Sequence, residues 1–161
     1  MILAFRAGPV RAASLLLLAL MLSVASAATA RTVQVHVVRD DRGGLISDRV
    51  DEIRRLRRSG ARVQIRGRVC YSSCTLFLGL PGACVSTRTT FGFHGPSRYG
   101  EPLPRAWFDY WSRVMADHYP PSLRHWFMSR ARHRIAGMYM VSGQELVRLG
   151  VPECDGRQDA P

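Results

Sequence analysis

Three short motifs carry the residue types that acyl-transfer chemistry uses. The first is Asp41-Arg42-Gly43-Gly44, a glycine pair whose backbone N–H groups could point into a cleft and stabilise an oxyanion. The second is Cys70-Tyr71-Ser72-Ser73-Cys74-Thr75, where a serine hydroxyl could lie near the amides of a helix N-terminus. The third is Phe93-His94-Gly95-Pro96, whose histidine could act as a general base. Together they supply the residue types of a nucleophile, a general base and an oxyanion hole.

Hydrophobic periodicity predicts the elements that position these motifs. Strands are predicted over 32–38, 63–69, 84–86, 89–94 and 138–141, and helices over 47–58, 72–80, 104–118, 122–132 and 142–149. The glycine pair then lies between a strand and a helix, the serines begin a short buried helix, and His94 ends a strand. Ser142 is predicted to cap the last helix. The alternating order predicts an α/β fold with a single domain over residues 31–152.

The motifs and their intervals resemble those of the Clp protease proteolytic subunit and its crotonase-like relatives, and most closely small exported proteins of that kind. In that family a strand leads to a Gly-Gly turn, a helix, another strand, the nucleophilic serine, and a histidine that ends a later strand. Ser72 follows Gly43 by 29 positions and precedes His94 by 22, which is close to the family's spacing. The run 140–151 matches the family's closing segment. The resemblance implies a Clp-protease/crotonase-like fold of repeated ββα units, in a compact and truncated form.

The resemblance also implies roles for individual residues. Ser72 matches the nucleophile and His94 the general base, and the amides of Gly43 and Ser73 match the oxyanion hole. It implies no cofactor and no metal, and a peptide or another acyl compound as substrate. From the residues alone Ser73 stays an alternative to Ser72, because either hydroxyl could cap the short helix. The family's catalytic aspartate falls at or near Met138.

The missing aspartate leaves a second functional interpretation open. Only Asp109 or Asp117, on another predicted helix, could supply an acid to His94. Without such an acid, a histidine that operates in a triad can lose about 10⁴ in turnover. The alternative is therefore a non-catalytic binding or interaction protein of the cell envelope, with a protein partner, that retains the fold without a complete triad.

The first thirty residues predict a secretory signal peptide. Arg6 and Arg11 form a positive start, an apolar run covers 12–25, and small residues follow, with cleavage expected after Ala27 or Ala30. The chain is therefore expected to be exported, to a bacterial periplasm or to the medium. The alternative is a membrane anchor formed by an uncleaved N-terminal segment, although the apolar run is shorter than the roughly 20 residues that a spanning helix needs.

Export changes the interpretation of the cysteines. Cys70, Cys74, Cys84 and Cys154 are an even number, and in an oxidising compartment they are expected to form disulfides, with three pairings open. A zinc site is the alternative, but two cysteines with three residues between them match no common finger or ribbon pattern. Residues 153–161 are predicted to be a polar C-terminal tail.

The charge excess does not predict a nucleic-acid partner. The chain has 23 Lys+Arg against 12 Asp+Glu, a formal charge of +11, and all of its cations are arginine. They are spread over predicted helix ends and loops instead of forming one basic stripe, so at most a weak contact with an anionic envelope surface is expected. His118, His125 and His133 are interpreted as scattered histidines, because Pro120-Pro121 separates the first from the others. The oligomeric state stays open.

Overall fold

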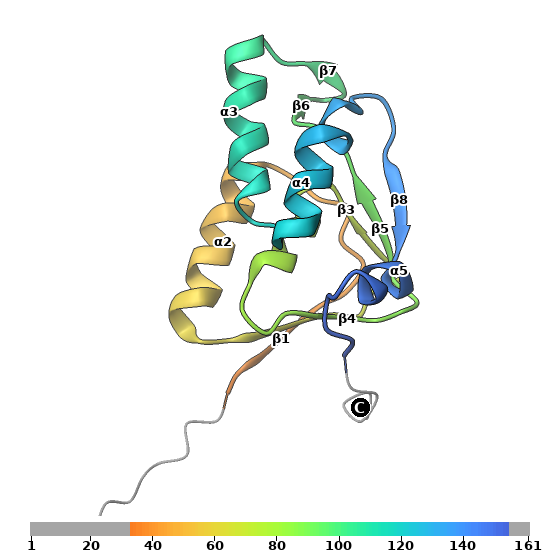
Figure 1. Ribbon diagram of the computed structural model, residues 1–161. Helices are drawn as coiled ribbons and strands as arrows, with labels where there is room; N and C mark the ends of the chain where they lie inside the picture. The colour runs from red at the N-terminus through yellow and green to blue at the C-terminus, as the bar shows by residue number, and fades with distance from the viewer. Residues whose placement is uncertain (1–32, 155–161) are drawn as a thin grey trace, which may run out of the picture. The chain divides into compact units, whose positions relative to one another are not determined.

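The computed structural model describes residues 33–154 (Figure 1). The predicted signal peptide at 1–30 lies outside the described residues, and so do positions 155–161 of the predicted tail. No helix within 33–154 is long and apolar enough to cross a membrane.

A parallel sheet holds the first predicted motif in place. Its strand order is β1 (Val35–Val38), β2 (Arg62–Ile65) and β4 (Cys84–Val85). Helix α2 (Ile46–Ser59) joins β1 to β2 and buries Val50 and Ile53. It ends at Gly60, whose φ of 69° is left-handed and whose amide donates to the last carbonyls of the helix. The glycine pair thus lies between the end of β1 and the start of α2.

A second sheet carries the serine and histidine motifs. It consists of β3 (Val69–Tyr71), β5 (Thr90–Phe93) and β8 (Tyr139–Ser142), in that order. The pair β3–β5 is parallel, whereas β8 runs antiparallel to β5. Ser142 caps the following helix, α5 (Gly143–Arg148), by accepting a hydrogen bond from the Glu145 amide, as predicted. The protein is therefore a mixed α/β fold built on two small sheets.

The prediction of one strand over 63–69 is wrong, because the chain breaks it at Gly67. The amides of Arg66 and Gly67 both donate to the Val38 carbonyl, at 2.9 and 3.2 Å, which ends the ladder with β1. A Cβ at Gly67 would lie 2.2 Å from the carbonyl carbon of Arg39, so only glycine allows this close approach. The two halves then enter different sheets as β2 and β3.

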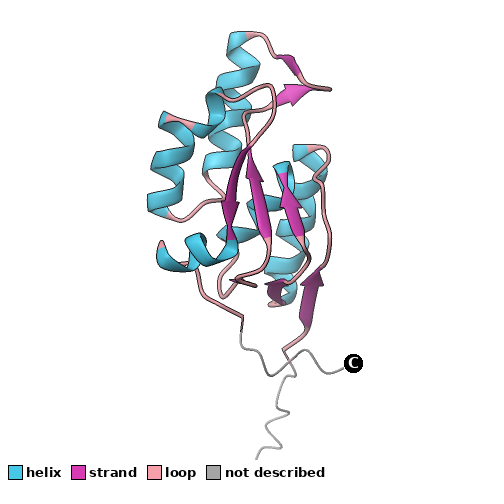
Figure 2. Cartoon of the chain, turned by 90° about the vertical axis from the view of Figure 1, so that its right-hand side faces the viewer, coloured by secondary structure: helices cyan, strands magenta, loops and turns pink. Residues whose placement is uncertain are grey.

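The remaining elements surround the sheets. They are the 3₁₀ helix η1 (Ser72–Gly79), the hairpin β6 (Ser97–Arg98) and β7 (Glu101–Pro102), helices α3 (Arg105–Ala116) and α4 (Pro121–Ser129), and the 3₁₀ turn η2 (Ala131–His133). The hairpin falls in the predicted loop over 95–104. Figure 2 shows the central strands between helices, with this hairpin apart from them. Most of η1 is buried, and Leu76 and Phe77 have no exposed surface.

Two disulfides use all four cysteines. Cys70 pairs with Cys74, and Cys84 pairs with Cys154, so disulfide formation is confirmed. The second bond lies beside backbone hydrogen bonds between β4 and the chain end, including Cys154 N–H to Val85 O at 3.0 Å. The first residues of the predicted tail, 153 and 154, are therefore attached to β4. The disulfides indicate an oxidising, exported environment.

Candidate active site

The register of the second sheet brings Ser72 and His94 together. Tyr71 on β3 lies opposite Gly92 on the parallel strand β5. Ser72, one residue beyond this pair, and His94, two residues beyond it, therefore lie at the same carboxyl edge, where ligands bind in open α/β sheets. There the Oγ atom of Ser72 lies 2.8 Å from Nε2 of His94. The two predicted residues thus form a hydrogen-bonded pair within the distance required of a nucleophile and its base.

A backbone carbonyl sets the tautomer of His94. Nδ1 of the ring lies 2.7 Å from the carbonyl oxygen of Gly95. Because a carbonyl oxygen can only accept, Nδ1 must carry the proton. In the neutral ring Nε2 is then unprotonated and accepts the Ser72 hydroxyl proton. Gly95 thus orients the base as a carboxylate does in a triad, but without a full negative charge.

The environment of His94 favours its neutral form. The ring is half-buried, and this desolvation lowers the pKa of His94 below its ordinary value, against a smaller upward effect of the Gly95 carbonyl. The neutral ring is the form that can accept the Ser72 proton. Burial therefore supports the role of a general base.

No carboxylate within residues 33–154 is hydrogen-bonded to His94. Asp109 pairs with Arg132 at 3.1 Å, and Asp117 pairs with Arg124 at 3.6 Å. The Sδ atom of Met138 lies where a Cβ on Gly92 would point, only 2.5 Å from it, so Met138 packs against β5 close to His94. The position that the resemblance assigns to the aspartate is therefore close to the pair but apolar.

Ser72 has a backbone conformation that is rare for a residue with a side chain. Its φ is 55°, in the left-handed region, at the turn from β3 into η1. Such conformations cost roughly 1 to 3 kcal/mol and persist where the surrounding structure enforces them. A nucleophile on a sharp strand-to-helix turn presents its hydroxyl at the top of the sheet.

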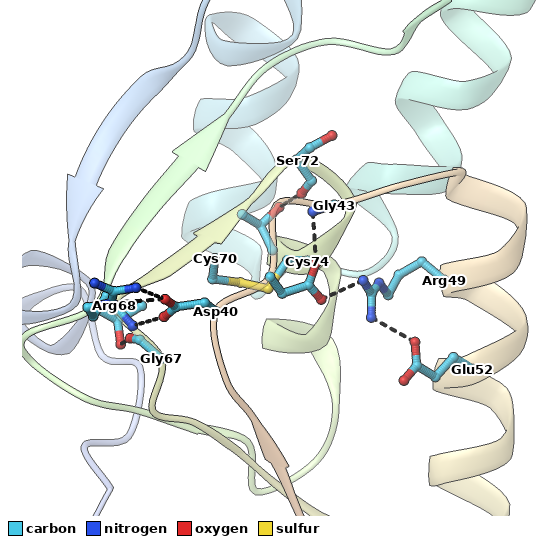
Figure 3. Close-up of a disulfide and its surroundings, with 12 residues drawn as sticks. Asp40, Gly43, Arg49, Glu52, Gly67, Arg68, Cys70, Ser72 and Cys74 are labelled. Atoms are coloured by element: carbon cyan, nitrogen blue, oxygen red, sulfur yellow. Dashed lines mark hydrogen bonds and ion pairs between the residues drawn. A yellow bond between two sulfur atoms is a disulfide. The ribbon is translucent and has the colours of Figure 1, made fainter. Parts of the chain in front are cut away.

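Several contacts enforce this turn. The Cys70–Cys74 disulfide joins the strand before Ser72 to the helix after it (Figure 3). Thr75 Oγ1 donates to the Ser72 carbonyl oxygen at 2.7 Å and lies 2.7 Å from the Tyr119 hydroxyl. Because Thr75 has already donated its proton, Tyr119 is the donor of the second bond. Both side chains are buried. The disulfide and the buried Thr75–Tyr119 pair thus both hold the backbone of Ser72 in this turn.

The glycine turn lies directly against the serine. A Cβ on Gly43 would fall 2.6 Å from Ser72 Cβ and 2.9 Å from the Tyr71 carbonyl oxygen. The Gly43 amide, however, donates to Asp41 Oδ1 at 2.8 Å. The Gly43 amide, for which an oxyanion role was predicted, is thus already hydrogen-bonded within the turn. Gly44 lines the same cavity as Ser72, and its amide has no acceptor within the described part of the chain.

The ion pairs that Arg49 forms with Asp41 and Glu52 were not predicted from the sequence. Arg49 on α2 contacts Asp41 Oδ2 at 2.5 Å and Glu52 Oε2 at 2.7 Å, and its guanidinium lies 4.4 Å from the ring centre of Phe77. Figure 3 shows Arg49 between the Gly43 turn and Glu52. The Asp-x-Gly sequence is a typical Asx-turn pattern and could have indicated the role of Asp41. The partnership with Arg49 depends on tertiary structure.

Ser73 points into the protein interior instead of the site. The residue is completely buried, and its Oγ atom has no hydrogen-bond partner within residues 33–154. Its backbone amide, as the second of η1, is one of those without an intrahelical acceptor. Of the two serines, Ser72 is therefore the one whose hydroxyl contacts His94.

Ser73→Ala is expected to leave the free energy of unfolding unchanged or to raise it by about 1 kcal/mol, because it removes an unpaired buried hydroxyl and keeps the backbone amide. Denaturant unfolding of the two proteins measures the difference. Ser59→Ala, at an exposed serine, is the control. A loss above about 1 kcal/mol would show that the Ser73 hydroxyl makes a stabilising bond.

A cavity of about 750 Å³ adjoins the Ser72–His94 pair. Its walls come from the start of α2, from the loop and hairpin after His94, and from α3. The lining residues are Gly44, Leu45, Ile46, Ser47, Ser72, His94, Gly95, Pro96, Ser97, Arg98, Tyr99, Gly100, Leu103, Trp111 and Met115. The volume suits a small organic ligand. In the described part of the chain, no three His, Cys, Asp or Glu side chains gather in a way that could hold a metal ion.

Fold and site together define an α/β protein with two disulfides and a serine–histidine pair at the edge of a sheet. No known protein-family model matches the chain. A comparison with curated protein sequences finds no match either.

Proposed function

We propose that the protein is an exported serine hydrolase, a peptidase or an esterase, with Ser72 as nucleophile and His94 as general base. The observation that carries the proposal is the 2.8 Å hydrogen bond between Ser72 Oγ and His94 Nε2 at the wall of a cavity. The tautomer imposed by Gly95 and the lowered pKa of His94 support the same roles.

The proposed reaction has two balanced steps. Ser72 Oγ attacks the acyl carbon while its proton moves to His94 Nε2, and the leaving group departs with that proton. Water then attacks the acyl-serine, gives a proton to His94, and releases the acid as the serine regains its proton. The amides of Gly44 and Ser73 would stabilise both oxyanions, with about 3 to 4 kcal/mol per donor in comparable sites.

The proposal includes a relationship to the Clp-protease/crotonase-like fold. Its support is the order of elements: a glycine turn after one strand, the serine after another, and the histidine at the end of the neighbouring parallel strand. The spacing of the three motifs points the same way. In this proposal the Gly95 carbonyl takes the orienting role of the family's aspartate.

Labelling with a fluorophosphonate probe tests the function. The wild-type protein is expected to be labelled between pH 6 and 9, and Ser72→Ala is expected to lose the label because no other hydroxyl within residues 33–154 is hydrogen-bonded to His94. Ser59→Ala is the matched control, since its hydroxyl is exposed and bonded to the Leu56 carbonyl. Absence of labelling on the folded wild-type protein would refute the hydrolase proposal.

No carboxylate among the described residues is hydrogen-bonded to His94, which favours a second candidate, a non-catalytic binding module of the cell envelope. In that case Ser72→Ala and His94→Ala would leave ligand binding and cellular function intact. A complementation assay with both variants separates the candidates: loss of function in either variant excludes the binding module.

The pH dependence of turnover follows from the lowered pKa of His94. The base must be unprotonated, so kcat/KM falls as the pH drops through the pKa of the free enzyme. We expect the midpoint of this acid limb to lie below the ordinary histidine value of 6.5. A pH–rate profile from 4.5 to 8 with a stable ester measures it. A midpoint above 7 would instead require an anionic partner for the ring.

A further inference from the structure

The cavity beside Ser72 has two apolar sides. Leu103, Trp111 and Met115 form the side nearest α3, and Leu45 and Ile46 form the side at the start of α2. Met115 is only 2% exposed, whereas Leu45 is 69% exposed. An apolar wall that runs from a buried floor to an exposed rim is suited to a hydrocarbon group that enters from solvent.

The cavity lining carries permanent charge of one sign only, which is positive. Among its residues Arg98 is the only permanently charged one, and there is no carboxylate. A cation that enters the cavity would therefore lose water without gaining a counter-charge, whereas an anion could approach Arg98. Arg98 is exposed and lies on the hairpin strand β6, at the outer part of the wall. The charge distribution favours a substrate that is uncharged or anionic at its outer end.

An aromatic surface continues the cavity outward. The ring of Trp111, which lines the cavity, lies 5.0 Å from that of Tyr110, which lies 6.0 Å from that of Trp107. Tyr110 and Trp107 are 47% and 58% exposed. A chain longer than the cavity would therefore keep apolar contact as it leaves.

We propose that the substrate is an ester whose acyl group is an unbranched hydrocarbon chain of medium length and whose alcohol part is uncharged or anionic. This inference rests on the hydrolase function proposed above. Ser72 Oγ forms the bond to the acyl carbon, the C–O bond of the ester breaks, and the alcohol leaves with the proton from His94. Water completes the hydrolysis to the fatty acid and restores Ser72.

A chain-length series tests the acyl part. The probes are the p-nitrophenyl esters of acetate, butyrate and octanoate. kcat/KM is expected to rise about threefold with each added methylene, as burial of that group predicts. Leu45→Gln, at an exposed position of the wall, is expected to lower the octanoate-to-acetate ratio at least threefold. Leu149→Gln, at another exposed leucine that lies outside the cavity, serves as the control and is expected to keep the wild-type ratio.

A pair of octanoyl esters tests the alcohol part. The wild-type protein is expected to prefer the ester of 3-hydroxypropanesulfonate over that of choline about tenfold, and Arg98→Gln is expected to abolish this preference. Equal rates across the chain-length series, or faster cleavage of a peptide anilide than of the octanoate ester, would overturn the proposed substrate class. Fluorophosphonate labelling distinguishes failure of the substrate proposal from failure of the hydrolase proposal. A labelled protein without chain-length preference remains a hydrolase, and an unlabelled protein refutes both proposals.

Discussion

Ser72→Ala is expected to reduce kcat about 10⁴-fold. In a full triad, loss of the serine costs about 2 × 10⁶, and much of the effect of the aspartate comes from fixing the histidine tautomer. Here the Gly95 carbonyl fixes that tautomer at 2.7 Å but adds no negative charge to stabilise the imidazolium. The expected loss is therefore smaller than in a triad, yet much larger than for a residue that only binds substrate.

A double-mutant cycle tests whether Ser72 and His94 act in the same step. His94→Ala alone is expected to cost about as much as Ser72→Ala, and the double variant no more than either, because both residues act in one proton transfer. The assay is single-turnover hydrolysis of a p-nitrophenyl ester, with circular dichroism to check folding. Retention of more than a tenth of the wild-type rate by Ser72→Ala, or additive losses in the double variant, would contradict the assigned roles.

The pairing of Ser72 with His94 was predicted from the family resemblance and the spacing of the motifs. Hydrophobic alternation alone predicted a strand over 63–69 and missed both its break at Gly67 and the end of β3 at Tyr71. Once β3 and β5 pair in parallel, with Tyr71 opposite Gly92, Ser72 and His94 lie one and two residues beyond this pair at the same edge. The contact between the two side chains therefore depends on strand pairing.

Other parts of the site depend on contacts that local patterns do not encode. The acceptor for His94 Nδ1 is a main-chain carbonyl, and every residue has one, so no residue type identifies Gly95. The disulfide pairing follows from backbone contacts: Cys154 pairs with Cys84 because residues 152–154 lie along β4. The break at Gly67 is also tertiary in origin, because the close neighbour is the Arg39 backbone.

The ion pair between Asp41 and Arg49 also fixes the glycine turn. Asp41 links three features: its backbone pairs with β3, through Tyr71 N–H to Asp41 O at 2.8 Å, and its carboxylate binds both the Gly43 amide and Arg49. The turn beside the nucleophile is therefore fixed to the strand that carries it and to α2. This rigid attachment leaves little room for adjustment, which determines the outcome of a substitution at Gly43.

Gly43→Ala is expected to lower kcat/KM by 10²- to 10³-fold and the free energy of unfolding by about 2 kcal/mol. The φ of 92° is unfavourable for alanine, and the new Cβ would lie 2.6 Å from Ser72 Cβ and 2.9 Å from the Tyr71 carbonyl oxygen. Neither atom belongs to the flexible end of a side chain, so the nucleophile or the turn must move. A displacement near 1 Å can cost about 10² in rate.

Gly60→Ala is the matched control for Gly43→Ala. Its φ of 69° is also left-handed, but a Cβ there would meet nothing within 4 Å. Backbone strain alone should therefore cost roughly 1 to 2 kcal/mol of stability and leave turnover unchanged. The rate of fluorophosphonate labelling, compared with denaturant unfolding for both variants, separates strain from displacement of the nucleophile. Equal labelling rates in the two variants would mean that Ser72 tolerates the added methyl group, and that the close packing of the glycine turn is not needed to position it.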